Sequence, residues 1–183
     1  MKKLLALAQA VVMALGMVAC GDKNQPEKPD EKTDTPPVEE STAKIQLTEN
    51  NGILEAVDVT TSPLEGCGVH VQVNKAEGTV TFIKTDDAGQ DTTEYYKFTP
   101  AKNEVEQFYF VAMMGTGFYY YFDTTAGEMV RMEDMDHNDS TQSAKDNGRF
   151  DKAAEGLKAD VTALQTYFET NYGMSIADAA SGK

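Results

Sequence analysis

Tryptophan is absent from this chain of 183 residues, and histidine and cysteine occur only twice each. Nucleophilic catalysis needs a reactive group beside a base, and apart from Cys67 and His70, considered below, no such spacing stands out. There is no glycine-rich phosphate loop either, so the sequence favours a protein that is not an enzyme. Basic residues are also scarce, with 16 Lys and Arg against 30 Asp and Glu and a formal net charge of −14. A surface of this sign repels nucleic-acid phosphate, so nucleic-acid binding is not expected.

Long apolar runs are missing except at the N-terminus. Lys2 and Lys3 are followed by an uncharged, mostly apolar stretch over 4–18, and the small Ala19 stands before Cys20. A basic start, an apolar middle and a small residue at the cleavage point are typical of a secretory signal peptide. The run is too short for a helix that would remain in a membrane. The sequence therefore predicts a signal peptide over 1–19.

The four residues Met17-Val18-Ala19-Cys20 resemble the lipobox of bacterial lipoproteins, with Met17 where leucine is usual. The resemblance covers residues 1–20 alone and implies that Cys20 becomes the mature N-terminus and carries a covalent lipid. In that family, a residue such as Gly21 rather than aspartate after the cysteine favours the outer membrane. We therefore expect a protein of the bacterial cell envelope, anchored by acyl chains at the outer membrane and facing either the periplasm or the outside. An ordinary secretory signal is the alternative.

Apolar periodicity is also absent from the segment that follows, 20–42. Prolines and acidic residues are interleaved there: Pro26, Glu27, Pro29, Asp30, Glu31, Asp34, Pro36, Pro37, Glu39 and Glu40. Such a composition cannot bury enough apolar area to offset the loss of chain entropy on folding. We expect 20–42 to be a disordered tether that holds the next domain away from the membrane.

Residues 43–174 have the patterning of one folded domain. Short runs rich in β-branched and aromatic residues, separated by turns that contain Gly, Asn or Asp, predict antiparallel strands. The expected strands are 43–49, 53–60, 69–73, 79–85, 92–99, 104–114, 118–123 and 128–133. Farther on, apolar residues at steps of three and four predict one long helix over about 148–172. Residues 175–183 are expected to form a tail.

The predicted fold class is α+β, mostly β: an antiparallel sheet of about eight short strands with one long C-terminal helix. Two arrangements fit this order of elements, an open curved sheet packed on the helix and a closed up-and-down barrel. The barrel would be similar to lipocalins in architecture, although none of the sequence signature of that family is present.

Aromatic residues are concentrated in the sixth and seventh predicted strands. With a two-residue loop at 115–116, Met113 would lie opposite Phe118, and Tyr119 and Tyr121 would share one face. Both faces of this hairpin are apolar, so we expect it to be central in the sheet and covered on both sides. Tyr119 and Tyr121 are a candidate partner surface, because tyrosine is enriched at interfaces, and ordinary sheet core is the alternative.

An acidic loop offers the best spacing for a metal. Asp134, Asp136 and Asn138, together with Asp139, place oxygen ligands at alternate positions and resemble the opening of a calcium-binding loop. Two departures count against calcium, because Asp139 stands where such a loop has its turn glycine and Lys145 where it has a bidentate glutamate. The alternative is a solvated acidic loop that starts a helix favourably.

Two further groupings have side chains of suitable chemistry. Thioether sulfurs and an imidazole suit copper(I), which points to Met129, Met132, Met135 and His137. On a regular strand, however, Met129 and Met132 would point to opposite faces unless the segment bends, and methionine is also an ordinary core residue. Cys67 and His70 could pair as thiol and base, but strand alternation would place them on opposite faces as well.

These observations together predict a membrane-anchored, non-enzymatic envelope lipoprotein whose tethered β-rich domain binds a protein or glycan partner. A lipocalin-like carrier of a small apolar ligand is the first alternative. A calcium- or copper-dependent binding module is the second. Apart from the covalent lipid on Cys20 and the calcium considered above, no cofactor is expected.

Overall fold

The computed structural model describes residues 43–182, and the predicted signal peptide, Cys20 and the tether 20–42 lie outside these residues. One antiparallel sheet contains all eight described strands, which follow one another across it in sequence order. They are β1 (Thr48–Asn50), β2 (Ile53–Asp58), β3 (Gly68–Asn74), β4 (Thr79–Thr85), β5 (Asp91–Thr99), β6 (Glu104–Val111), β7 (Thr116–Asp123) and β8 (Glu128–Asp134). The sheet ends at β1 and β8 without closing, so the open arrangement is the correct one of the two expected. The predicted α+β, mostly β fold class is confirmed.

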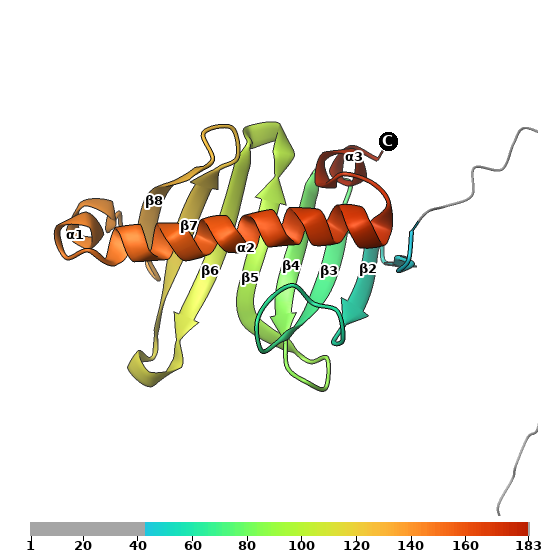
Figure 1. Cartoon of the computed structure of the whole chain (residues 1–183), viewed down its shortest axis with the longest axis horizontal. Helices are drawn as coiled ribbons and strands as arrows, with labels where there is room; N and C mark the ends of the chain where they lie inside the picture. The colour runs from blue at the N-terminus through green and yellow to red at the C-terminus, as the bar shows by residue number, and fades with distance from the viewer. Residues whose placement is uncertain (1–42, 183) are drawn as a thin grey trace, which may run out of the picture. The chain divides into compact units, whose positions relative to one another are not determined.

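One long helix, α2 (Arg149–Tyr172), runs across the strands on one face of the sheet (Figure 1). Alternation within the strands supplies the side chains that it covers: Val69 and Val71 point toward the helix and are buried, whereas His70 points away. The apolar stripe of α2 packs on them through Leu157, Val161, Leu164, Phe168 and Tyr172. The described buried core is therefore a two-layer one, with the sheet as one layer and the helices as the other.

Two short helices complete this side of the molecule. α1 (Thr141–Asp146) precedes α2 and buries Ala144, and α3 (Ile176–Ser181) follows it. α3 lies in the segment predicted to be a tail, but Ile176, Ala179 and Ala180 belong to the same core as α2. The buried core residues among 43–182 form one cluster, to which the sheet and all three helices contribute. No helix among residues 43–182 combines the length and apolar character needed to span a membrane.

Two hydrogen bonds, one buried and one partly buried, join the helix to distant parts of the sheet. The Tyr167 hydroxyl donates to Asp58 Oδ2 over 2.8 Å, and the Tyr96 hydroxyl donates to Asp160 Oδ2 over 2.6 Å. Burial alone would raise the pKa of Asp58, but hydrogen bonds from Thr60, Thr61 and Tyr167 outweigh it and hold this pKa well below its usual range. A charged, fully bonded Asp58 thus fixes the end of β2 against α2.

The hairpin of β6 and β7 differs from the prediction in its register. Residues 112–114 form a short 3₁₀ turn, η2 (Ala112–Met114), and Gly115 follows with φ of 61°, a conformation that favours glycine. Tyr109 consequently lies opposite Phe118, and Met113 is at the exposed tip. A second 3₁₀ turn, η1 (Pro100–Lys102), joins β5 to β6. The assignment of residues to the two faces of the hairpin was nevertheless correct, because the register changed by an even number of residues.

Candidate partner-binding face of the sheet

The described helices all contribute to one core on one side of the sheet, and the opposite face, here called the free face, has no described element over it. The hairpin was expected to be central in the sheet and covered on both sides. β6 and β7 are both interior strands, and among residues 43–182 no helix or strand covers their second face. β6 and β7 nevertheless direct large side chains to the free face, because alternate residues of both strands are aromatic. The free face therefore combines apolar side chains with direct access to water.

A row of aromatic rings crosses the free face. Tyr95, Phe108 and Tyr119 are direct cross-strand neighbours on β5, β6 and β7. Ring centroids are 6.1 Å apart for Tyr95 and Phe108 and 4.9 Å apart for Phe108 and Tyr119. The imidazole of His137, from the loop after β8, stacks on Tyr119 at 4.3 Å. These four residues, called the aromatic row below, shield one another by stacking.

Gly117 makes room for the centre of the aromatic row. A Cβ at this position would lie 2.7 Å from the Phe108 ring and 3.0 Å from the Tyr109 carbonyl oxygen. Since real Cβ atoms do not approach other atoms so closely, the glycine allows the ring to lie over the strand. Phe108 is left only 9% exposed although no helix covers it.

A hydrogen-bonded network lies at the β8 end of the row and is organised by Glu133. The carboxylate of Glu133 accepts from the Tyr121 hydroxyl at 2.9 Å and pairs with Arg131 at 3.0 Å. His137 Nδ1 lies 3.1 Å from the same group. The Arg131 guanidinium covers the Tyr121 ring at 3.8 Å from its centroid. Tyr121 is thus nearly buried, and burial together with its bond to Glu133 raises its pKa.

Acidic side chains dominate the remainder of the free face. The carboxylates there include those of Glu55, Asp91, Glu104, Glu106, Asp123 and Glu133, whereas the cations include Lys97 and Arg131. Glu106 accepts from the Tyr95 hydroxyl at 2.7 Å, and burial with this bond raises the pKa of Tyr95. Beside the row, a hollow of about 360 Å³ lies over the short side chains of Thr79 and Thr81.

Of the predicted site residues, Tyr119 and Tyr121 do share this face, and neither stands isolated. Tyr119 belongs to the aromatic row and Tyr121 to the Glu133 network. The contributions of Arg131 and Glu133 were not predicted. Arg131 lies opposite Tyr121 on the neighbouring strand, and this contact can be predicted only when the register of β7 and β8 is known.

The acidic loop is held by its own hydrogen bonds. The Asp134 carboxylate accepts from the backbone N–H groups of Asp136 and Asn138 at 2.9 Å each and from the Asn138 amide at 3.0 Å. These bonds hold the pKa of Asp134 below its usual range. Asp139 accepts from Thr141 N–H at 2.8 Å and so precedes the first turn of α1. Residues 43–182 contain no group of three His, Cys, Asp or Glu side chains placed to hold a metal ion, and calcium binding stays a prediction.

The methionines do not form a common site with His137. A bulge in the pairing of β7 with β8 turns Met129 and Met132 to the same side, where both are buried in the core. Met135 is 45% exposed, and His137 is stacked on the free face. The structure therefore separates the residues that copper would need to bring together.

Cys67 and His70 lie on opposite faces, as strand alternation predicted. Cys67 packs against the core on the helix side, and burial raises the pKa of its thiol. His70 lies on the free face between two carboxylates, 2.9 Å from Asp91 and 3.5 Å from Glu55. The two side chains cannot act as nucleophile and base on one substrate.

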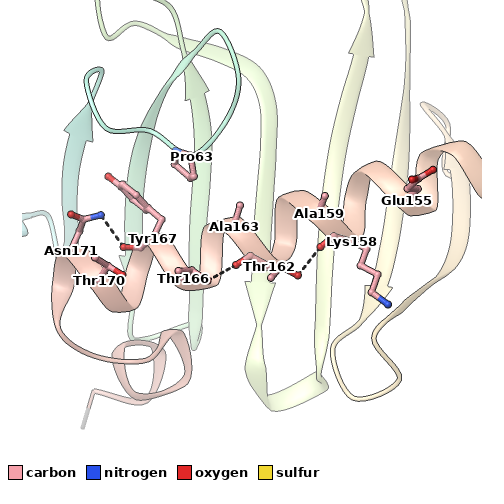
Figure 2. A pocket seen from close by; sticks show the side chains of 10 residues that line it. All are labelled: Pro63, Glu155, Lys158, Ala159, Thr162, Ala163, Thr166, Tyr167, Thr170 and Asn171. Carbon is pink, nitrogen blue, oxygen red and sulfur yellow. Dashed lines mark hydrogen bonds between the residues drawn. The ribbon is translucent and has the colours of Figure 1, made fainter.

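The outer surface of α2 carries a shallow hollow of about 700 Å³ beside Pro63, shown in Figure 2. Small residues such as Ala163 line it, and the hydroxyls of Thr162 and Thr166 donate to backbone carbonyls four residues earlier in the same helix. These hydroxyl groups therefore donate within α2 itself. The outer surface of α2 serves as the control surface in the experiments on the free face below.

Comparison with known proteins gives this chain no relative from which a function could be transferred. No family model matches it, and neither a curated protein nor a solved structure is similar to it. The arrangement of its own side chains is therefore the basis for assigning a function.

Proposed function

We propose that this chain is a lipid-anchored, non-enzymatic lipoprotein of the bacterial envelope whose β-rich domain binds a protein partner through the free face. The anchor rests on the lipobox-like sequence that ends at Cys20. The binding role rests on one observation, the aromatic row on a sheet face that no described element covers.

A protein partner is favoured over a glycan by the way the rings lie. A sugar would stack on the flat face of an aromatic ring, but in this row the rings take up one another's faces. What they offer outward is edges and hydroxyl groups. An aromatic and arginine centre with a polar, charged rim is the composition of many protein interfaces. The excess of carboxylates on the free face favours a partner whose contacting surface is basic.

Photo-crosslinking in producing cells tests the binding face. A photo-reactive amino acid at position 119 should yield a covalent adduct with one partner protein, whereas the same amino acid at position 166, on the outer surface of α2, should yield none. Glu104→Lys should reduce the adduct at position 119, because it removes charge complementarity, and Glu169→Lys on α2 is the matched control. Equal adducts at the two positions, or none at position 119, would refute the proposed face.

The lipid anchor is tested separately. Metabolic labelling with radioactive palmitate should mark the wild-type protein and leave Cys20→Ser unlabelled, since the thiol is the attachment point. Cys67→Ser controls for the second cysteine and should keep the label. Labelling that survives Cys20→Ser would overturn the anchor without affecting the binding face.

A further inference from the structure

Another concave feature lies on the helix side of the sheet. β6 and β7 extend past α2 on that side (Figure 1). A groove of about 410 Å³ separates the first turns of α2 from this hairpin. Its walls include Tyr109, Val111, Met114 and Phe118 from the hairpin. Tyr109 is 39% exposed and Met114 71% exposed, so the wall is an apolar surface in contact with water. The volume is in the range of small-molecule sites, which are mostly apolar with a few polar groups.

The polar atoms in the floor of the groove are already paired with one another. Gln107 donates to the Tyr96 hydroxyl over 2.8 Å, and that hydroxyl donates to Asp160. Burial raises the pKa of Tyr120 to about 12, so this hydroxyl is neutral at physiological pH. A molecule that reaches the floor would therefore find few unpaired polar groups there, and an apolar body fits it best.

Positive charge is concentrated at one rim of the groove. Arg149 and Lys152 lie in the first turn of α2, both exposed, and neither forms an ion pair with a carboxylate among residues 43–182. Lys84, the third cation of the groove, is instead neutralised by Glu94 at 2.8 Å. The start of a helix of 24 residues adds a partial positive charge at the same end.

Negative charge lies at the other end. Asp160 follows Arg149 by eleven residues, which corresponds to about 16 Å along a helix. Asp151 is the one acidic residue in the first turn of α2, and it is exposed and does not line the groove. In a chain of formal net charge −14, a groove with two unpaired cations at one rim is a marked local exception.

We propose that this groove binds an amphipathic anion of fatty-acid chemistry, with its carboxylate at Arg149 and Lys152 and its hydrocarbon chain along Tyr109, Val111 and Met114. The ligand carboxylate is attracted to the Arg149 and Lys152 end of the groove, since Asp160 at the other end would repel it. Methionine suits the tail, because its flexible thioether adapts to an unbranched chain. The ligand site is on the opposite side of the sheet from the proposed partner face, and neither proposal depends on the other.

The test uses the purified full-length chain and dodecanoate as the probe. Isothermal titration calorimetry should show binding of dodecanoate with an affinity about tenfold or more above that of dodecanol, because the alcohol lacks the charge-assisted hydrogen bonds. Dodecylamine, which has the same chain with the opposite charge, should not bind measurably. Dodecanoate should also raise the melting temperature, as any ligand of the folded state does.

Matched variants locate the site. Lys152→Glu should weaken dodecanoate binding about tenfold, whereas Lys158→Glu, an exposed lysine of α2 outside the groove, should leave it unchanged. Met114→Asp should also weaken binding, and Met113→Asp at the fully exposed tip should not. All four positions are exposed, so circular dichroism should show that the variants remain folded.

Three results would overturn the proposal: no binding of dodecanoate, equal affinity for the acid and the alcohol, or an equal loss in Lys152→Glu and Lys158→Glu. The partner face is judged independently, because a substitution at Tyr119 should leave dodecanoate binding unchanged.

Discussion

The two faces of this sheet are both aromatic, yet they are shielded from water in different ways. On the helix side, Phe82 packs edge-on against Phe98 and Phe168 at centroid distances of 5.4 and 5.9 Å, and α2 seals the cluster. On the free face, Tyr95, Phe108 and Tyr119 shield one another, so that Phe108 is buried while the two tyrosines stay partly exposed. The part of the sheet that lies under α2 is thus unavailable to a partner, whereas a face that shields itself by stacking keeps an outward surface available.

The hydrogen bonds between side chains also differ between the two faces. On the helix side, hydrogen bonds link residues far apart in the sequence, as from Tyr167 to Asp58. On the free face they join neighbouring strands, as from Tyr95 to Glu106. Disruption of the helix side should therefore affect the whole fold, and disruption of the free face should affect a local surface.

The largest effect is expected from Phe168→Ala on the helix side. Phe168 is fully buried and contacts Phe82 and Tyr172, so the truncation removes apolar contacts and leaves a cavity. We expect the free energy of unfolding to fall by about 4 kcal/mol, measured by urea denaturation. Tyr119→Ala on the free face is the comparison and should cost less than half as much. Equal losses would mean that the free face is as much a core as the helix side.

Asp58→Asn is expected to have the next largest effect, about 3 kcal/mol at pH 7, because the charged carboxylate accepts several hydrogen bonds while buried. The pKa of Asp58 in the folded protein is lowered, so the stability it contributes is complete above the pKa of an unfolded aspartate, about 4, and is lost as the pH falls below that value.

Urea denaturation of the wild type and Asp58→Asn at pH 7 and pH 3 measures this contribution. The difference between the two proteins should be smaller at pH 3, because the wild type has then lost part of the advantage of the charged group. A difference that is independent of pH would show that the carboxylate charge is unimportant to folding.

Gly117→Ala probes the centre of the aromatic row and should cost about 2 kcal/mol, because the added methyl group overlaps the Phe108 ring and the Tyr109 carbonyl. Phe108→Ala should reduce the cost of Gly117→Ala in the double variant, which a double-mutant cycle of denaturation measurements would show. Gly156→Ala is the matched control: nothing lies near its Cβ position, and alanine favours a helix, so this change should stabilise by up to about 1 kcal/mol. A Gly117→Ala protein as stable as the wild type would contradict the packing described for Phe108.

The strands and α2 could be predicted because their signals are local. Alternation in Val69–Val73 and the stripe from Phe150 to Tyr172 each depend on a few neighbouring residues, and both hold in the structure. The missed helix α3 also has a local signal, since Ser175 accepts from the N–H of Asp178 as an N-cap. Its six residues are too few for an apolar period to be distinguished from chance.

The candidate site could be predicted only in part because it depends on pairing between strands. Tyr119 and Tyr121 were recognised from their residue type, but the partners of each ring depend on register. The bulge between β7 and β8 placed Met132 in the core and left Arg131 over Tyr121. The groove beside α2 was not predictable at all, because it arises from the length of β6 and β7 beyond a helix that crosses them.

The smallest effect on stability, about 1 kcal/mol, is expected from Glu133→Gln, which distinguishes a structural role of the free face from a binding role. The carboxylate is approached by three donors, from Tyr121, Arg131 and His137, whereas a glutamine has one acceptor oxygen and turns its NH₂ group toward one of them. The loss of stability should appear in urea denaturation and be smaller at high salt, since the ion pair with Arg131 is partly exposed.

Glu133→Gln should also reduce the yield of the crosslinked adduct at position 119. This reduction should exceed what the loss of folded protein accounts for, because Arg131 and His137 lose the carboxylate that positions them. If stability and crosslinking fell in proportion, Glu133 would only support the fold, and the partner would have to bind elsewhere on the sheet.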